Sequence, residues 1–388
     1  VTMVRNSRAQ SSPNIRLANK WALRFVPITI TVALLAWLLT GEVKRAVAVL
    51  VVATPCPLIL AVPIALVAGM SRAAKSGAVI KGGAILEKLS RAEIVLLDKT
   101  GTVTHGGPVI AEIVALPGLT TEYVLQIAAS LDQYSPHVVA KSLVEEAKRR
   151  EIKLLTASEI VEEHGKEVKG LVAGKKIRVG AVPDSLPKWA QIKEPLLVAL
   201  HVDEELIAVF GLEDPIRNES RKTVQDLYRL GIKEIVMVTG DKLDTAQAVA
   251  SELGIKKVIA NSKPETKLNL VHEYRNKFSG TVIVVGDGIN DAPALAASDV
   301  GIAMGARGAS AASEAADVVI IEDSIDRVTS AIGFAKISHR KALQASVGGM
   351  GLALIAMIAA ALGKLTPSEG AIRSEERRVG KECLRLCR

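Results

Sequence analysis

Three long stretches of the sequence carry no charged residue, and this limits the folds that are open to the chain. The stretches are residues 25–41, 46–71 and 342–363, with lengths of 17, 26 and 22 residues. A helix needs roughly 20 apolar residues to cross the hydrocarbon core of a bilayer. A buried core helix is a credible alternative only for the first and shortest stretch. We therefore predict three transmembrane α-helices, at about residues 23–41, 44–71 and 342–363.

Basic residues flank the segment between the second and third stretches. They are Arg72, Lys75, Lys81, Lys88 and Arg91 after the second stretch, and Lys336, His339, Arg340 and Lys341 before the third. Because basic residues accumulate in cytoplasmic loops, the segment is expected in the cytoplasm, where ATP is present. Residues 72–341 are too many for a simple connection and must form folded domains. The sequence thus predicts an integral protein of the cell (plasma) membrane with a cytoplasmic catalytic loop.

Asp98 stands at the end of an apolar run, residues 94–97, and is followed by Lys99, Thr100 and Thr102. The carboxyl end of a buried strand is where open α/β sheets bind ligands. An aspartate placed there can attack phosphorus and form an aspartyl-phosphate. The lysine, the two hydroxyls and nearby backbone N–H groups are suited to hold the phosphoryl oxygens. A lone aspartate often only caps a turn, but the whole pentapeptide favours phosphoryl transfer.

Two further apolar, β-branched segments end at glycine and an acid. Residues 234–238 run into Thr-Gly-Asp at 239–241, and residues 281–285 run into Gly-Asp-Gly-Ile-Asn-Asp at 286–291. Each segment is typical of a strand that is followed by a helix. Three parallel strands would bring Asp98 and both of these motifs to one edge of a sheet.

Two carboxylates close together at that edge need a cation. Asp98 and Asp287 offer hard oxygen ligands beside a phosphate, which suits Mg²⁺. Lys267, in Pro-Glu-Thr-Lys at 264–267, is a candidate to neutralise the phosphoryl group.

The motifs at 98–102, 239–241 and 286–291 resemble the three phosphorylation-domain signatures of P-type ATPases, ion pumps whose catalytic domain has a haloacid-dehalogenase-like α/β fold. Glu-Asp-Pro-Ile-Arg at 213–217 also resembles a turn of that family, and the resemblance runs from about residue 13 to about residue 371. It implies that Asp98 is the phosphorylated nucleophile. The implied catalytic residues are Asp98, Lys99, Thr100, Thr102, Thr239, Gly240, Asp241, Lys267 and Asn290, and the implied Mg²⁺ ligands are Asp98, Asp287, Asp291 and the carbonyl of Thr100.

The resemblance also predicts how the chain divides into domains. We expect two transmembrane helices in residues 1–71 and a third in residues 336–372. The phosphorylation domain is predicted to be split between residues 72–116 and 205–335, with an inserted α/β nucleotide-binding domain at residues 117–204. No Gly-x-x-x-x-Gly-Lys-Ser/Thr occurs, so a P-loop does not hold the nucleotide; in the family, the insert binds ATP.

Two elements of the insert resemble nucleotide contacts of metal-transporting members. Asp132 and Ser-Pro-His at 135–137 resemble the acid and the Ser-Glu-His-Pro element, with proline now preceding the histidine. An imidazole can stack on adenine or hydrogen-bond to it, so His137 is the first candidate. The alternative is an exposed histidine at the start of a helix.

Glycines of the insert match the family only in part. Gly165 and Gly170 correspond to the outer glycines of the Gly-x-Gly-x-x-Gly nucleotide loop, but Glu167 replaces the middle one. Gly180 is a further candidate contact, although Ala181 follows it where an asparagine is usual. These departures leave a retuned or degraded nucleotide site open.

Thr-Pro-Cys-Pro at 54–57 interrupts the second charge-free stretch. Prolines remove helix hydrogen bonds, and broken helices inside a membrane line binding sites. Cys56 adds a potential soft ligand, although a lone membrane cysteine is ordinarily a small buried hydrophobe. The element resembles the Cys-Pro-Cys motif of transition-metal P-type ATPases, with Thr54 in place of the first cysteine. One thiolate and one hydroxyl form a harder site, which weakens the case for Cu⁺ and leaves Zn²⁺, Co²⁺, Mn²⁺, Fe²⁺ and Ni²⁺ open.

The ends of the sequence depart from a complete pump. Thr-Gly-Glu, the actuator tripeptide of the family, occurs only at 40–42, where the first predicted helix ends outside the membrane. We therefore expect a C-terminal part that lacks the actuator domain and earlier transmembrane segments, and that autophosphorylates with slow turnover. Residues 373–388 resemble a translated sequencing adapter, with a charged amphipathic tail as the alternative. Without them the net charge falls from +8 to +5, so the tail is no basis for nucleic-acid binding.

Three functions remain after these observations. The first is ATP-driven transport of a transition-metal cation by an incomplete P-type ATPase, with Mg²⁺ and ATP as cofactors and membrane lipid around it. The second is a membrane-tethered haloacid-dehalogenase-type phosphohydrolase, which would not depend on Cys56. The third is a metal-binding membrane fragment without turnover. A potassium or calcium pump is disfavoured, because neither needs a membrane thiol between prolines.

Overall fold

The computed structural model describes residues 13–53, 56–163, 167–183, 185–192, 194, 196–287, 289–305 and 311–367; for residues 13–25, 56–61, 289 and 311 it describes the backbone alone. The chain forms two compact units. The first comprises Val1–Asp98, Arg221–Gly240 and Ala250–Arg388, and the second comprises Lys99–Ser220 and Asp241–Val249. Residues 373–388, the predicted non-native tail, lie outside the described residues.

Seven strands form the sheet of the first unit, in the order β1-β13-β12-β11-β2-β9-β10. Every neighbouring pair is parallel except β1 with β13. The strands are β1 (Ala78–Ile80), β2 (Ala92–Asp98), β9 (Glu234–Val238), β10 (Lys257–Ile259), β11 (Thr281–Gly286), β12 (Val300–Ala303) and β13 (Val318–Ile320). The central strands are buried and nearly continuous in apolar residues, as expected for a parallel sheet covered on both faces.

Helices connect these parallel strands. They are α5 (Gly83–Ser90), α8 (Ser220–Arg229), α9 (Leu243–Leu253), α10 (Pro264–Lys277), α11 (Ala292–Ala297) and α12 (Ala311–Ala315). Strand β2 pairs with β9 on one side and with β11 on the other. Since these three strands are parallel, their carboxyl ends meet at one edge, where the three predicted motifs begin.

The second unit contains a six-stranded antiparallel sheet in the order β3-β8-β7-β6-β5-β4. Its strands are β3 (Val109–Ala115), β4 (Ala157–Glu163), β5 (Glu167–Val172), β6 (Lys175–Gly180), β7 (Leu196–Val202) and β8 (Glu205–Glu213), and a short 3₁₀ turn covers Lys188–Ala190. Helices α6 (Thr121–Asp132) and α7 (Val138–Arg149) share an apolar core with this sheet.

The boundaries predicted for the inserted domain, residues 117 and 204, are too narrow. Strand β3 precedes the predicted insert and β8 follows it, yet both belong to the six-stranded sheet. The reason is that β3 and β8 pair with each other over nearly their full length. The two strands therefore extend the inserted domain on both sides of the predicted boundaries. Amino-acid composition does not change at the start of β3 or at the end of β8, so it could not locate these boundaries.

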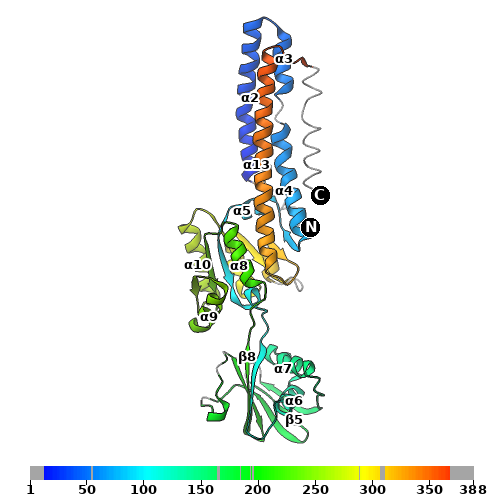
Figure 1. The fold of residues 1–388 in the computed structure, drawn as a ribbon, viewed down its shortest axis with the longest axis vertical. Coiled ribbons are helices and arrows are strands. Elements are labelled where there is room, and N and C mark those ends of the chain that lie inside the picture. Colours follow the sequence, from blue (N-terminus) through cyan, green and yellow to red (C-terminus); the bar gives the residue numbers. More distant parts are fainter. Residues whose placement is uncertain are drawn as a thin grey trace. The chain divides into compact units, whose positions relative to one another are not determined.

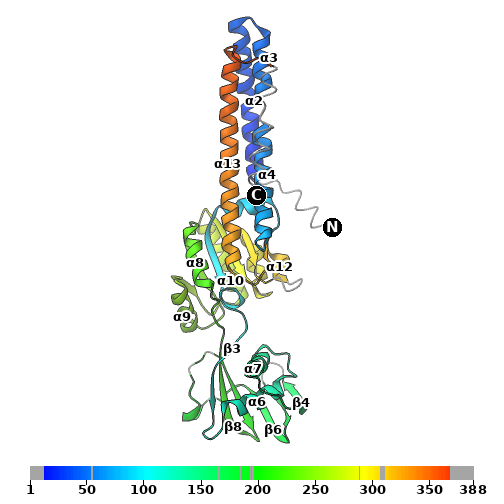
Figure 2. The same cartoon turned by 45° about the vertical axis from the view of Figure 1, so that its right-hand side comes forward.

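Four helices of the first unit pack together, with the two longest side by side and the two shorter ones one beyond the other along them (Figure 1, Figure 2). They are α2 (Pro13–Thr40), α3 (Val43–Val52), α4 (Cys56–Lys75) and α13 (Asp326–Ala361). Buried small and aliphatic side chains join α2, α3 and α13, among them Ala33, Val49 and Met357. Within the described residues, α13 alone is long and apolar enough to cross a membrane.

The helices differ in extent from the predicted spans. The second predicted span is two helices, since α3 ends at Val52 and α4 begins at Cys56, and Thr54 and Pro55 lie outside the described residues. The third predicted span, 342–363, is the end of a helix that begins at Asp326. Lack of charge marks only the apolar part of a helix, and no proline interrupts the polar turns before it.

Candidate active site

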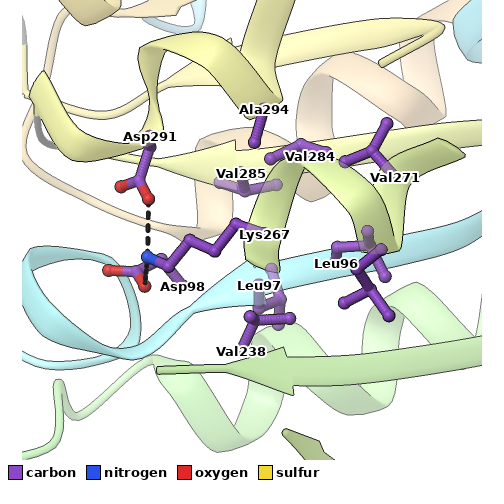
Figure 3. Close-up of a pocket in the computed structure, with 11 residues that line it drawn as sticks. Leu96, Leu97, Asp98, Val238, Lys267, Val271, Val284, Val285, Asp291 and Ala294 are labelled. Carbon is purple, nitrogen blue, oxygen red and sulfur yellow. Dashed lines mark hydrogen bonds and ion pairs between the residues drawn. The ribbon is translucent and has the colours of Figure 1, made fainter. Parts of the chain in front are cut away.

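Asp98 and Asp291 share one ammonium group at the carboxyl edge of the seven-stranded sheet. The Nζ of Lys267 lies 2.6 Å from an Oδ1 of each aspartate. Figure 3 shows the lysine side chain reaching between the two carboxylates, in a pocket whose apolar lining includes Leu97 and Val285. Side-chain exposures of 11% for Asp98, 5% for Asp291 and 13% for Lys267 mean that water screens these contacts little.

The charges of this triad and its burial set the pKa of Asp98 near neutral pH, so that both protonation states are accessible there. Burial, together with the nearby charges of Asp291 and Asp287, raises the pKa of Asp98 to about 7 against the opposing attraction of Lys267. Burial alone would lower the pKa of Lys267, but its ion pairs with Asp98 and Asp291 outweigh that effect and raise its pKa. The lysine therefore stays charged, and its charge favours the ionised, nucleophilic form of Asp98.

Asp287 completes a group of three carboxylates that suits a divalent cation. It follows β11 and is exposed, and one oxygen each of Asp98, Asp287 and Asp291 lie within 4.8 Å of one another. Hard oxygen donors this close are the ligand type that Mg²⁺ prefers. Thr100, the fourth predicted ligand, belongs to the other compact unit, and the cluster is built without it.

Other predicted residues of the first unit lie at strand ends. Thr239 follows β9 and is buried; its N–H donates to the carbonyl of Ile259 at 3.0 Å, and its own carbonyl accepts from the N–H of Ser262 at 2.9 Å. These bonds fix the start of the Thr-Gly-Asp motif against the turn after β10. Gly240 comes next, and Asn290 is exposed in the turn before α11.

The turn after Asp98, Lys99–Val103, is held within the second unit. Lys99 forms an ion pair with Asp241 at 2.5 Å, so two predicted residues are partners of each other. Gly101 has a φ of +69°, which favours glycine. Thr102 is fully buried, and its hydroxyl has no hydrogen-bond partner among the described residues. Thr100, between Lys99 and Gly101, has an extended backbone.

Arg217 and Asp214 clamp the same turn, and neither was among the predicted site residues. The buried guanidinium of Arg217 donates to the carbonyl of Thr104 at 2.8 Å and to that of Gly101 at 3.2 Å. Asp214 accepts from the Thr104 hydroxyl at 2.6 Å and from the N–H of Gly106 at 2.9 Å. The acidic-basic turn at 213–217 was the sequence signal that could have placed them here.

A cavity of about 220 Å³ opens in the second unit, lined by Asp132, His137 and Gly180 among others. His137 is the N-cap of α7, where its Nδ1 accepts from the N–H of Val139 at 3.3 Å. Gly165 lies outside the described residues. Gly170 is not among the lining residues; a Cβ there would stand 2.7 Å from a methyl group of Leu131, so it allows close packing against α6. The structure therefore gathers three of the five predicted nucleotide contacts around one cavity.

Asp132 is 2% exposed, and its Oδ1 has no hydrogen-bond partner among the described residues. Burial, reinforced by the charge of Glu162, raises its pKa to about 7. Glu162 also lines the cavity and accepts from the Ser135 hydroxyl at 2.9 Å. Sequence reasoning missed Glu162, because nothing in the sequence pairs strand β4 with the end of α6.

Replacing Asp132 by asparagine is expected to flatten a pH dependence of local stability. Since the folded pKa is raised, native Asp132 holds its proton until about pH 7, whereas the unfolded carboxyl loses it near pH 4. The stability of α6 against local opening therefore falls as the pH rises through this range. Between pH 6 and 8, the equilibrium constant for opening rises about tenfold. Amide hydrogen exchange of α6 in the full chain, corrected for the intrinsic exchange rates at each pH, measures this opening constant. An equal loss of protection in the Asp132→Asn variant would show that this carboxyl is not the cause.

The side chains of the predicted transported-metal site fall outside the described part of the chain. Thr54 lies outside the described residues, and only the backbone of Cys56 is described, as the first residue of α4.

The comparisons with known proteins agree with this geometry. The model of the family described as "haloacid dehalogenase-like hydrolase" matches residues 92–299, more than half of the chain. The chain belongs to the haloacid dehalogenase-like hydrolases. The matched range includes the central strands β2, β9, β10 and β11 of the seven-stranded sheet and the whole six-stranded sheet.

The relatives of this haloacid dehalogenase-like hydrolase are metal-transporting P-type ATPases. It is 36% identical over 340 residues to a copper-transporting ATPase of Helicobacter felis, covering 86% of this chain and 46% of that protein. It is also 36% identical over 345 residues to a manganese-exporting P-type ATPase of Mycobacterium bovis, covering 84% and 48%. The chain thus spans about half the length of these relatives.

A solved structure supports the whole fold. The crystal structure of a zinc-transporting PIB-type ATPase in its E2.Pi state superposes with a TM-score of 0.82 at 28% identity, covering 100% of this chain and 66% of that one. The likeness therefore includes the long helices as well as both sheets.

Proposed function

We propose that this chain carries the catalytic and membrane parts of an ATP-driven transition-metal transporter, in which Asp98 accepts the γ-phosphoryl group of ATP. The observation that carries the proposal is the triad of Asp98, Lys267 and Asp291 at the end of β2, with Asp287 beside it. The named relatives favour transport over a tethered phosphohydrolase or a metal-binding fragment without turnover.

The chemistry follows from what each side chain offers. An Oδ of Asp98 forms a bond to the γ-phosphorus while the bond from that phosphorus to the β–γ bridging oxygen breaks, and ADP leaves with that oxygen. Lys267 neutralises negative charge on the transferring group, as a fixed cation in a site poor in water can do. Asp98, Asp287 and Asp291 would hold Mg²⁺, which supplies further charge neutralisation when it is bound.

The cavity of the second unit is proposed to take the adenine end of ATP. Its volume and its mixed lining suit a base rather than a triphosphate, because the carboxylate of Glu162 lies in the cavity and would repel phosphates. The unpartnered Oδ1 of Asp132 offers an acceptor to an exocyclic amine, and the His137 ring offers a surface for stacking.

The direct test is labelling from ATP. The full chain, incubated with ATP labelled at the γ-phosphate and Mg²⁺, should form a covalent phosphoprotein that hydroxylamine cleaves, because an acyl-phosphate is labile to that nucleophile. Chelation of Mg²⁺ should abolish the labelling. Label that resists hydroxylamine, or that forms equally well without a divalent cation, would overturn the proposal.

The cargo is proposed to be a transition metal bound at Cys56 and Thr54, with the segment between α4 and α13 in the cytoplasm. We expect one metal of a panel containing Zn²⁺, Co²⁺, Mn²⁺, Fe²⁺, Ni²⁺ and Cu⁺ to change the steady-state label by severalfold, and Cys56→Ser to remove that response, because a hydroxyl is a poor soft-metal ligand. The basal label with ATP and Mg²⁺ should survive in the variant. A metal response that persists in Cys56→Ser would contradict this cargo site.

A further inference from the structure

A shallow pocket lies between α4 and α13, away from both sites described above. The two helices approach each other closely beside it, since a Cβ added to Gly69 would stand 2.2 Å from the Ser338 hydroxyl oxygen. The pocket has an apolar wall and two basic side chains, and its lining is Ala65, Ala68, Gly69, Arg72, Phe334, Ile337, Ser338 and Lys341.

The two cations of the pocket stand at a defined level of the helices. Arg72 is the first charged residue after the charge-free stretch 46–71, and Lys341 is the last before the stretch 342–363. If α4 and α13 cross a bilayer as proposed, both lie where the hydrocarbon core gives way to the headgroups. Exposed aliphatic side chains continue from the pocket toward the apolar stretches, among them Val67 and Leu343.

Neither cation has an acidic partner. In the described part of the chain, the side chains of Arg72 and Lys341 take part in no hydrogen bond or ion pair, and α4 and the last 35 residues of α13 contain no acid. By contrast, Arg91 is paired with Glu87, and Lys336 donates to the carbonyl of Leu230. Two cations on one pocket repel each other, and an anion bound between them would relieve that repulsion.

We propose that this pocket binds the phosphate of an anionic phospholipid, with its acyl chains along the exposed aliphatic surface of α4 and α13. The apolar wall and the position at the membrane boundary favour a lipid over free phosphate, and basic pockets between helices are suited to such headgroups. The inference goes beyond the proposed catalysis and depends only on the proposed membrane placement.

The test uses the full chain in phosphatidylcholine nanodiscs with spin-labelled phosphatidylglycerol or spin-labelled phosphatidylcholine as the probe. Electron paramagnetic resonance gives the motionally restricted fraction of each probe, and thus their relative affinity, at an ionic strength that screens diffuse attraction. We expect Arg72→Gln/Lys341→Gln to lower the preference for phosphatidylglycerol at least fivefold more than Lys75→Gln/Arg340→Gln. The control pair removes the same charge from neighbouring positions of the same two helices but lies outside the pocket. A fivefold difference in relative affinity corresponds to roughly 1 kcal/mol.

The charge-conserving variant Arg72→Lys/Lys341→Arg should keep most of the preference, which separates loss of charge from misfolding. An equal loss in both Gln pairs would show diffuse attraction and overturn the pocket. Displacement of the lipid by inorganic phosphate at constant ionic strength would reassign the site to a small anion. A chain that fails to enter nanodiscs would refute the membrane placement, whereas labelling of Asp98 tests catalysis separately.

Discussion

Replacing Asp98 by asparagine is expected to lower phosphoprotein formation from ATP by roughly 10³-fold or more, the scale seen when a nucleophile is removed. An amide has nearly the shape of the carboxylate but is too weak a nucleophile to attack phosphorus. Initial rates of acid-stable label, taken with saturating ATP and Mg²⁺, measure the effect.

Asp244→Asn is the matched control for this experiment. Asp244 is an exposed carboxylate in the first turn of α9, and its loss should leave the rate within about twofold, as for most surface substitutions. Residual labelling of Asp98→Asn near the wild-type rate would place the phosphate on another residue and refute the nucleophile.

Lys267→Met is expected to reduce both the labelling rate and the stability of the site. Methionine fills similar space but leaves Asp98 and Asp291 facing each other without the ammonium group that lies 2.6 Å from each. Removing one partner of a buried ion pair costs about 3–5 kcal/mol. Losing a fixed charge at the transferring group costs about 10²–10³ in rate. Quenched-flow labelling and thermal unfolding, both with and without Mg²⁺, measure these effects.

Two further variants sharpen this result. Lys263→Met removes an exposed lysine from the start of the same helix and should change neither quantity appreciably. Lys267→Arg keeps the positive charge but replaces the compact ammonium group by a planar guanidinium. Compared with Lys267→Met, it should restore the thermal stability more completely than the labelling rate. Labelling by Lys267→Met at the wild-type rate would show that this lysine serves only the fold.

Sequence reasoning predicted that the three motifs meet at one edge of a sheet, because strand periodicity and the residues at strand ends are local features. Each apolar run, before Asp98, Thr239 or Asp287, can be recognised from a few consecutive residues. Parallel pairing of the three strands then brings their ends together. The same reasoning misplaced the domain boundary, because the pairing of β3 with β8 joins segments about 100 residues apart, and no local pattern records it.

The sequence by itself determined which groups are available: an aspartate at the end of an apolar strand, further acidic residues at the ends of other strands, and apolar segments on both sides of a large domain. Only the tertiary structure decided the partners. Lys267 meets Asp98 across 169 residues of chain, whereas Lys99, the immediate neighbour of Asp98, pairs with Asp241. Glu162 beside Asp132, and Arg72 in one pocket with Lys341, follow in the same way. The reason is physical: residue type sets what a side chain can do, while buried charges take the partner that the packing of distant elements supplies.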